Sequence, residues 1–115
     1  MVNREVVGAH YGLRDWLAQR VTAVIMVVYT VIILSAIAGV WPLDYWQWKV
    51  LWQNTLVRYA TVLCMASLLY HAWIGMRNIF MDYVKAPELR LSLYVITICA
   101  LLWYGVWLAQ ILWGL

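Results

Sequence analysis

Three long stretches of the chain are apolar and carry charges only near their ends, and shorter polar segments separate them. They cover residues 16–41, 57–79 and 90–113. A helix rises about 1.5 Å per residue, so roughly 20 residues cross the hydrocarbon layer of a bilayer. A lone strand would leave its backbone groups unpaired in lipid. The pattern therefore predicts an all-α membrane protein with three transmembrane helices.

The composition agrees with this pattern. Of the 115 residues, 67% are hydrophobic and 11% are charged, and the mean hydropathy is +0.80. Soluble domains are about half apolar and roughly a quarter charged, so membrane lipid must surround most of the chain. Three spans leave room for one membrane-anchor domain over residues 1–115. The net charge of +3 is small and scattered, which excludes nucleic-acid binding as its purpose.

Two features of the apolar runs carry no chemistry. Cys64 and Cys99 lie far from any metal-binding spacing, and we expect both to be small apolar fillers. The sequence Ala36-Ile37-Ala38 resembles a signal-peptide cleavage site. The apolar run before it is longer than the usual ~7–15 residues of a signal peptide, so we expect the first span to be retained.

The segment between the first two spans, residues 43–55, is rich in aromatic side chains. Trp41, Tyr45, Trp48 and Trp52 recur at helical spacing, which places them on one face. Amphipathic rings collect at the membrane–water interface. We expect a short helix there, lying in the head-group layer.

The cations predict the orientation of the chain. Six lie before the first span or around the second connection, residues 80–89, which contains Pro87: Arg4, Arg14, Arg20, Arg77, Lys85 and Arg90. The opposite side has only Lys49 and Arg58. Cytoplasmic segments carry the excess of Lys and Arg. We expect a cytoplasmic N-terminus, a cytoplasmic second connection and a periplasmic C-terminus.

His71 is the histidine within a span, and an ionisable residue at that depth is a functional hypothesis by default. It belongs to a stripe of small residues at helical spacing: Ala60, Cys64, Ser67, His71 and Gly75. Such a stripe lets a flat cofactor approach, such as a haem with an axial imidazole. It equally suits a packing seam against another helix. The other histidine, His10, lies outside the spans, so a second axial ligand would come from another chain.

Asp82 and Tyr83 follow where the second span leaves the membrane. A phenol at that depth can donate a hydrogen bond to a carbonyl oxygen of a lipid-soluble substrate. The adjacent carboxylate can take up protons or hold an arginine. The alternative is an interfacial tyrosine anchor beside a solvated aspartate.

These residues carry a resemblance to a known family. His71-Ala-Trp-Ile-Gly-Met76, Asp82-Tyr-Val-Lys85 and Leu89-Arg-Leu91, with Arg20-Val-Thr-Ala23 opening the first span, resemble the smaller of the two hydrophobic membrane anchors of bacterial succinate dehydrogenase. The strong match covers roughly residues 71–91.

The resemblance implies a place in respiratory complex II. A flavoprotein subunit carries FAD and oxidises succinate, and an iron–sulfur subunit conducts the electrons. This anchor and a companion cytochrome b556 anchor hold haem b and a ubiquinone site in the bacterial inner membrane, with a trimer of heterotetramers as one possible assembly. The chain would be a multi-pass subunit of an enzyme, with no catalytic residue of its own.

The resemblance also implies roles for single residues. His71 corresponds to an axial ligand of the haem iron, Tyr83 to the residue that hydrogen-bonds the quinone, and Asp82 to a neighbour of that site. This chain has Arg14 where familiar members place a histidine near the haem propionates. An arginine can pair with a carboxylate bidentately, so Arg14 and Arg20 are both propionate candidates, with a positive-inside anchor as the alternative for Arg20.

Two rival functions remain open. A fumarate reductase anchor uses the same machinery in reverse, often without haem. A structural small membrane protein would use His71 only for helix packing.

Overall fold

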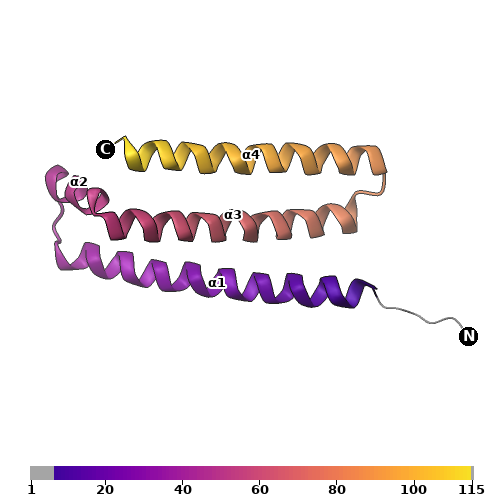
Figure 1. Ribbon diagram of the computed structural model, residues 1–115, viewed down its shortest axis with the longest axis horizontal. Coiled ribbons are helices and arrows are strands. Elements are labelled where there is room, and N and C mark those ends of the chain that lie inside the picture. Colours follow the sequence, from indigo (N-terminus) through magenta and orange to yellow (C-terminus); the bar gives the residue numbers. More distant parts are fainter. Residues whose placement is uncertain (1–6, 115) are drawn as a thin grey trace, which may run out of the picture.

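The computed structural model describes the backbone of residues 7–114 and the side chains of residues 12–114. It contains four helices: α1 (Val7–Gly39), α2 (Tyr45–Gln53), α3 (Thr55–Tyr83) and α4 (Pro87–Trp113) (Figure 1). No strand occurs in residues 7–114. The predicted all-α class is confirmed. His10 and Arg4, which entered the sequence argument, lie outside the described side chains.

Three of the helices are long and apolar enough to cross a membrane, as the sequence predicts. They are Gly12–Gly39 within α1, α3 and α4. The helices extend beyond the apolar runs, since α3 continues to Tyr83 and α4 begins at Pro87. The polar connection therefore narrows to residues 84–86. Helical hydrogen bonds continue past the point at which hydropathy falls, because the backbone stays paired in the interface as well.

The aromatic segment forms the short helix α2, and polar side chains define its ends. Asp44 and Gln47 form a reciprocal capping box at its start. The Asn54 side chain accepts hydrogen bonds from the backbone N–H groups of Leu56 and Val57, which opens α3. Asn54 thus separates two helices that would otherwise run together.

The long helices lie side by side in one row, with α3 between α1 and α4 (Figure 1). Neighbours in the row are antiparallel, so the start of α1 and the α3–α4 connection share one end of the molecule. α2 and the end of α4 lie at the other end. The outer ends of the first and last candidate spans, Gly12 and Trp113, therefore lie at opposite ends of the row.

The row of helices has almost no closed core. Among the described side chains, the buried ones are Thr22, Thr61, Ser67, Ile74 and Leu112. Most large apolar side chains are exposed. Lipid or other helices must cover these faces.

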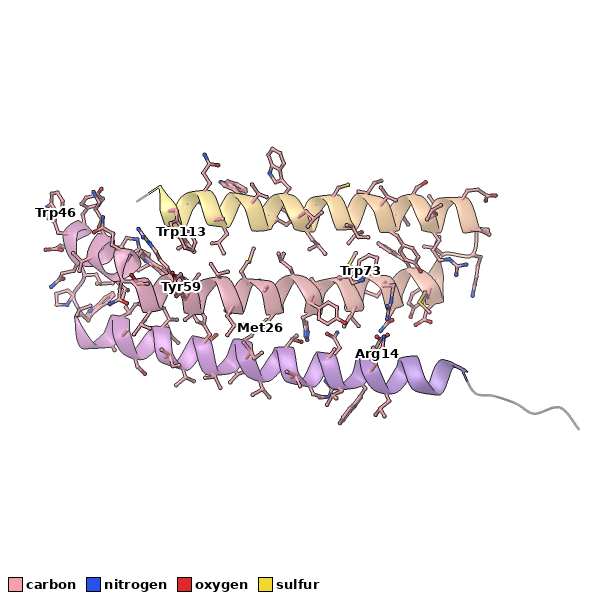
Figure 2. All side chains as sticks on the ribbon, viewed as in Figure 1. Arg14, Met26, Trp46, Tyr59, Trp73 and Trp113 are labelled. Carbon is pink, nitrogen blue, oxygen red and sulfur yellow. The ribbon has the colours of Figure 1, made fainter. Side chains whose placement is uncertain are left out.

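α4 packs on α3 through aromatic rings and one close approach. Trp73 lies on the side of α3 that faces α4 (Figure 2). The centroid of its ring is 5.7 Å from the centroid of the Tyr94 ring on α4. A Cβ added to Gly105 would come within 3.2 Å of the Leu69 side chain. Glycine at this position therefore lets the two helices approach closely.

Candidate functional site

A cavity of about 870 Å³ lies between the first half of α1 and the second half of α3. Ligand sites in proteins commonly have volumes of roughly 300–1,000 Å³. The lining residues come from three helices: Gly12, Asp15, Trp16, Gln19 and Arg20 from α1, His71, Arg77, Asn78 and Met81 from α3, and Tyr94 from α4. Two of the candidate residues from the sequence, His71 and Arg20, are among them.

His71 projects from α3 and is half-buried against α1. Its Nδ1 lies 3.0 Å from Oγ1 of Thr22, with which it forms a hydrogen bond. Among the described residues, the other ring nitrogen, Nε2, has no hydrogen-bond partner. His71 also borders a second hollow of about 320 Å³, lined otherwise by α1 residues that include Ala23, Met26 and Thr30. The imidazole therefore lies where two adjoining hollows meet.

An ion pair joins α1 and α3 within the lining of the cavity. Arg77 of α3 donates a charge-assisted hydrogen bond to the Asp15 carboxylate of α1. Their side chains are 30% and 19% exposed. The pair fixes the start of α1 against the end of α3.

Two buried polar atoms near this ion pair lack a partner among the described residues. They are Oε1 of Gln19 and Nε of Arg77. A buried acceptor or donor without a hydrogen bond costs about 1–3 kcal/mol, so each such atom needs an explanation. Both residues line the cavity, and a polar group of a ligand or of another chain would satisfy them.

The structure distinguishes the two candidate arginines. Arg20 lines the cavity, and its guanidinium lies 5.3 Å from the centre of the Trp16 ring. Arg14 is exposed on α1 and is not among the lining residues. Arg20 is therefore the arginine that could meet an anionic group bound beside His71.

Asp82 and Tyr83 lie apart from this cavity. They are the last two residues of α3 and are exposed, Tyr83 to 80%. By helical rise, Tyr83 lies about 18 Å along α3 from His71. Neither residue lines the cavity beside His71, and both side chains are open to their surroundings.

The stripe of small residues serves partly as a packing seam. Ser67 is buried, and a Cβ added to Gly75 would meet the Gln19 side chain at 3.8 Å, an ordinary contact. Part of the stripe thus faces α1 of the same chain. His71 can take part in helix packing and in ligand binding, because its ring contacts α1 and also borders the cavity.

Sequence reasoning assigned no role to Thr22, Asp15, Gln19 or Tyr94. The signal for the ion pair was present, since the antiparallel first and second spans bring Asp15 and Arg77 to the same depth. Thr22 closely follows Arg20, but a threonine in an apolar helix is too common to single out. Its significance depends on the register between α1 and α3.

The donor set fits a flat cofactor held by one imidazole. The described side chains contain no group of three or more His, Cys, Asp or Glu that could hold a bare metal ion. The large cavity has His71 as a single possible ligand and Arg20 as a cation beside it. These groups, with the unpartnered Oε1 of Gln19 and Nε of Arg77, suit an anionic macrocycle such as haem. The cavity is thus chemically compatible with the haem that the sequence leads us to expect.

Comparison with known proteins gives a consistent result. The family of succinate dehydrogenase/fumarate reductase transmembrane subunits matches residues 2–107. A succinate dehydrogenase hydrophobic membrane anchor subunit of Coxiella burnetii is 38% identical over 102 residues, which cover 89% of each chain. A protein of the same description from Rickettsia felis is 33% identical, covering 74% of this chain and 71% of its own.

Proposed function

Because the chain belongs to the family of succinate dehydrogenase/fumarate reductase transmembrane subunits, we propose that it anchors a succinate:quinone oxidoreductase in the bacterial inner membrane, where it helps to bind haem b and ubiquinone. The observation that carries the proposal is the position of His71, an intramembrane imidazole bordering a large cavity. A soluble flavoprotein subunit and an iron–sulfur subunit would dock on the anchor. FAD and the iron–sulfur clusters belong to those partners.

His71 holds the iron of the haem in this proposal. A b-type haem supplies reversible one-electron transfer when it is bound. Nδ1 of His71 is occupied by Thr22, so Nε2 is the ring nitrogen that remains for ligation. A second ligand would come from the companion b556 anchor, since the described part of this chain has no second histidine side chain.

The polar residues of the cavity orient the cofactor and balance its charge. Arg20, already over Trp16, pairs with a propionate through charge-assisted hydrogen bonds. The unpartnered Oε1 of Gln19 and Nε of Arg77 are two further sites that a bound group or the companion chain satisfies. Arg14 stays at the periphery and acts through its charge.

Tyr83 and Asp82 form this chain's share of the quinone site. The Tyr83 hydroxyl donates a hydrogen bond to one carbonyl oxygen of the quinone, and Asp82 borders the path by which water supplies protons. Their exposure on the isolated chain supports this role, because a site completed by other subunits leaves its residues uncovered here. On the proposed orientation both lie at the cytoplasmic side, beside the iron–sulfur subunit.

A fumarate reductase anchor is the second candidate, since the family description includes it. The intramembrane His71 favours the succinate dehydrogenase assignment, because haem-free fumarate reductase anchors need no axial ligand. The relatives from Coxiella burnetii and Rickettsia felis carry the succinate dehydrogenase description.

Co-purification tests the assignment. The chain, tagged at one end, is isolated in mild detergent from membranes of cells that express the whole complex. We expect flavin, iron–sulfur clusters and a second hydrophobic subunit to accompany it in fixed proportion. A structural protein with a packing histidine would bring down neither flavin nor iron–sulfur clusters, and that result would reject the proposal.

A further inference from the structure

We propose that Thr22 is a positioning residue for His71: its hydroxyl fixes the tautomer and the orientation of the imidazole, so that Nε2 carries the lone pair that binds iron. The inference rests on the proposed ligation of haem by His71. It adds a residue on α1 that controls a ligand on α3.

The Thr22 hydroxyl already donates its proton to a hydrogen bond within α1. Oγ1 lies 2.6 Å from the carbonyl oxygen of Ala18, one turn earlier, and 3.2 Å from that of Gln19. Two oxygen atoms at 2.6 Å need a hydrogen between them, and a carbonyl has none to give. The hydroxyl therefore donates to Ala18, and only its lone pairs remain for another partner.

His71 must then be the donor in the bond between the two helices. Nδ1 lies 3.0 Å from Oγ1 of Thr22, and an acceptor there requires a proton on Nδ1. A neutral imidazole with Nδ1–H has its free lone pair on Nε2. A chain of two hydrogen bonds thus runs from the ring of His71 to the hydroxyl of Thr22 and on to the carbonyl of Ala18. It leaves Nε2 as the ring nitrogen that can bind iron.

The burial of Thr22 strengthens the effect of this hydrogen bond on His71. Thr22 is 6% exposed, so water does not compete for its hydroxyl. A histidine that binds a metal commonly donates its other N–H group to a fixed acceptor, which orients the ring and raises its basicity. Stronger donation from His71 stabilises ferric over ferrous iron. Loss of the bond is therefore expected to raise the midpoint potential of the haem.

The chain contains a matched control. Thr61 is also buried, 9% exposed, and its Oγ1 donates to the Val57 carbonyl oxygen at 2.7 Å. It accepts from the Tyr29 hydroxyl at 2.6 Å, again across the contact between α1 and α3. Thr61 repeats the geometry of Thr22 with a tyrosine in place of the histidine. It shares the packing role and should not affect the iron.

The test uses the intact complex with Thr22→Val, Thr22→Ser and Thr61→Val. Three properties are measured: the haem-to-flavin ratio, the electron paramagnetic resonance spectrum of the ferric haem, and its midpoint potential by redox titration. We expect Thr22→Val to shift the ferric signal, raise the potential and weaken haem retention by roughly 10–100-fold in affinity. Thr22→Ser should restore wild-type values. Thr61→Val should leave all three unchanged, even if it lowers thermal stability.

Each outcome decides the matter. If Thr22→Val keeps the wild-type signal and potential, or if Thr61→Val changes them equally, Thr22 has only a packing role and the proposal is overturned. If Thr22→Val does not assemble, Thr22→Cys replaces the hydroxyl by a weak acceptor of similar size, and a wild-type spectrum in that variant overturns it. A haem that survives His71→Ala unchanged would instead reject the proposed ligation itself.

Discussion

His71 and Tyr83 have different surroundings and different proposed roles. His71 forms a hydrogen bond with Thr22 and borders a cavity, so a residue of α1 orients its ring. Tyr83 is 80% exposed and has no described partner. The fixed orientation of His71 agrees with a ligand for a cofactor that two chains share. The exposure of Tyr83 agrees with a substrate site that other subunits complete.

Replacing the Tyr83 hydroxyl tests the second position. Tyr83→Phe removes the hydroxyl that we propose donates to the quinone, and it leaves the ring in place. Because each 1.36 kcal/mol corresponds to a factor of ten in rate, and a hydrogen bond is worth about 0.5–1.5 kcal/mol, we expect quinone reduction to fall roughly three- to tenfold in kcat/KM. Succinate oxidation by a soluble dye that bypasses the membrane subunits should be unaffected.

Tyr59 provides the control for that substitution. It lies near the other end of α3 (Figure 2) and is 62% exposed, so Tyr59→Phe removes an equally accessible hydroxyl far from the proposed site. Wild-type quinone reduction by Tyr83→Phe, or an equal loss in both variants, would contradict the role of Tyr83.

At the scale of helices, polar contacts set the register between α1 and α3. Three lie along the contact: the Asp15–Arg77 ion pair, the Thr22–His71 bond and the Tyr29–Thr61 bond. Lipid tails are as apolar as leucine, so apolar packing discriminates little between registers in a membrane, and hydrogen bonds between helices matter more. These contacts keep Arg20 and His71 on the same cavity.

The ion pair can be tested by a double-mutant cycle. Asp15→Asn, Arg77→Gln and the double variant are compared by the unfolding free energy of the detergent-solubilised complex. The pair is partly exposed, so its coupling should fall between surface and buried values, about 1–3 kcal/mol. Strictly additive effects of the two substitutions would show that the ion pair does not join the helices.

The sequence predicts the helices well and their contacts poorly. Apolar runs longer than a bilayer requires leave helix as the only choice, and the aromatic spacing from Tyr45 to Trp52 correctly predicts the short helix α2. Helix α3 continues beyond the predicted span of residues 57–79 to Tyr83, because a fall in hydropathy does not by itself end a helix. The partner of His71 could not be predicted, since an apolar span does not reveal its rotation about its own axis.

The whole molecule is a single row of helices with little interior. Only five described side chains are buried, and three of them bear hydroxyl groups. A row this open has faces on both sides for further helices, which agrees with its membership of a family of transmembrane subunits. The sequence also predicts that a haem site would be incomplete in this chain, because a six-coordinate haem would require a second histidine and the spans contain only His71.

The orientation of the row in the membrane is a prediction of the positive charges. In a background with Cys64→Ser and Cys99→Ser, Lys85→Cys and Trp46→Cys are treated in intact cells with a maleimide that cannot cross the inner membrane. Lys85 lies in the connection between α3 and α4, and Trp46 lies in α2 at the opposite end of the row (Figures 1 and 2). Because the end that holds Lys85 is the cation-rich one, we expect labelling of Trp46→Cys alone. Labelling of Lys85→Cys alone would mean that the chain is inserted the other way round.

The central claim is that His71 holds a haem iron within an anchor of this family, and an optical spectrum of the purified complex tests it most directly. The reduced-minus-oxidised spectrum of the wild-type complex should show a b-type band in proportion to flavin. His71→Ala should abolish that band or shift it, while flavin and the partner subunits still co-purify. A wild-type complex without a b-type band, or a band that His71→Ala leaves unchanged, would contradict the account.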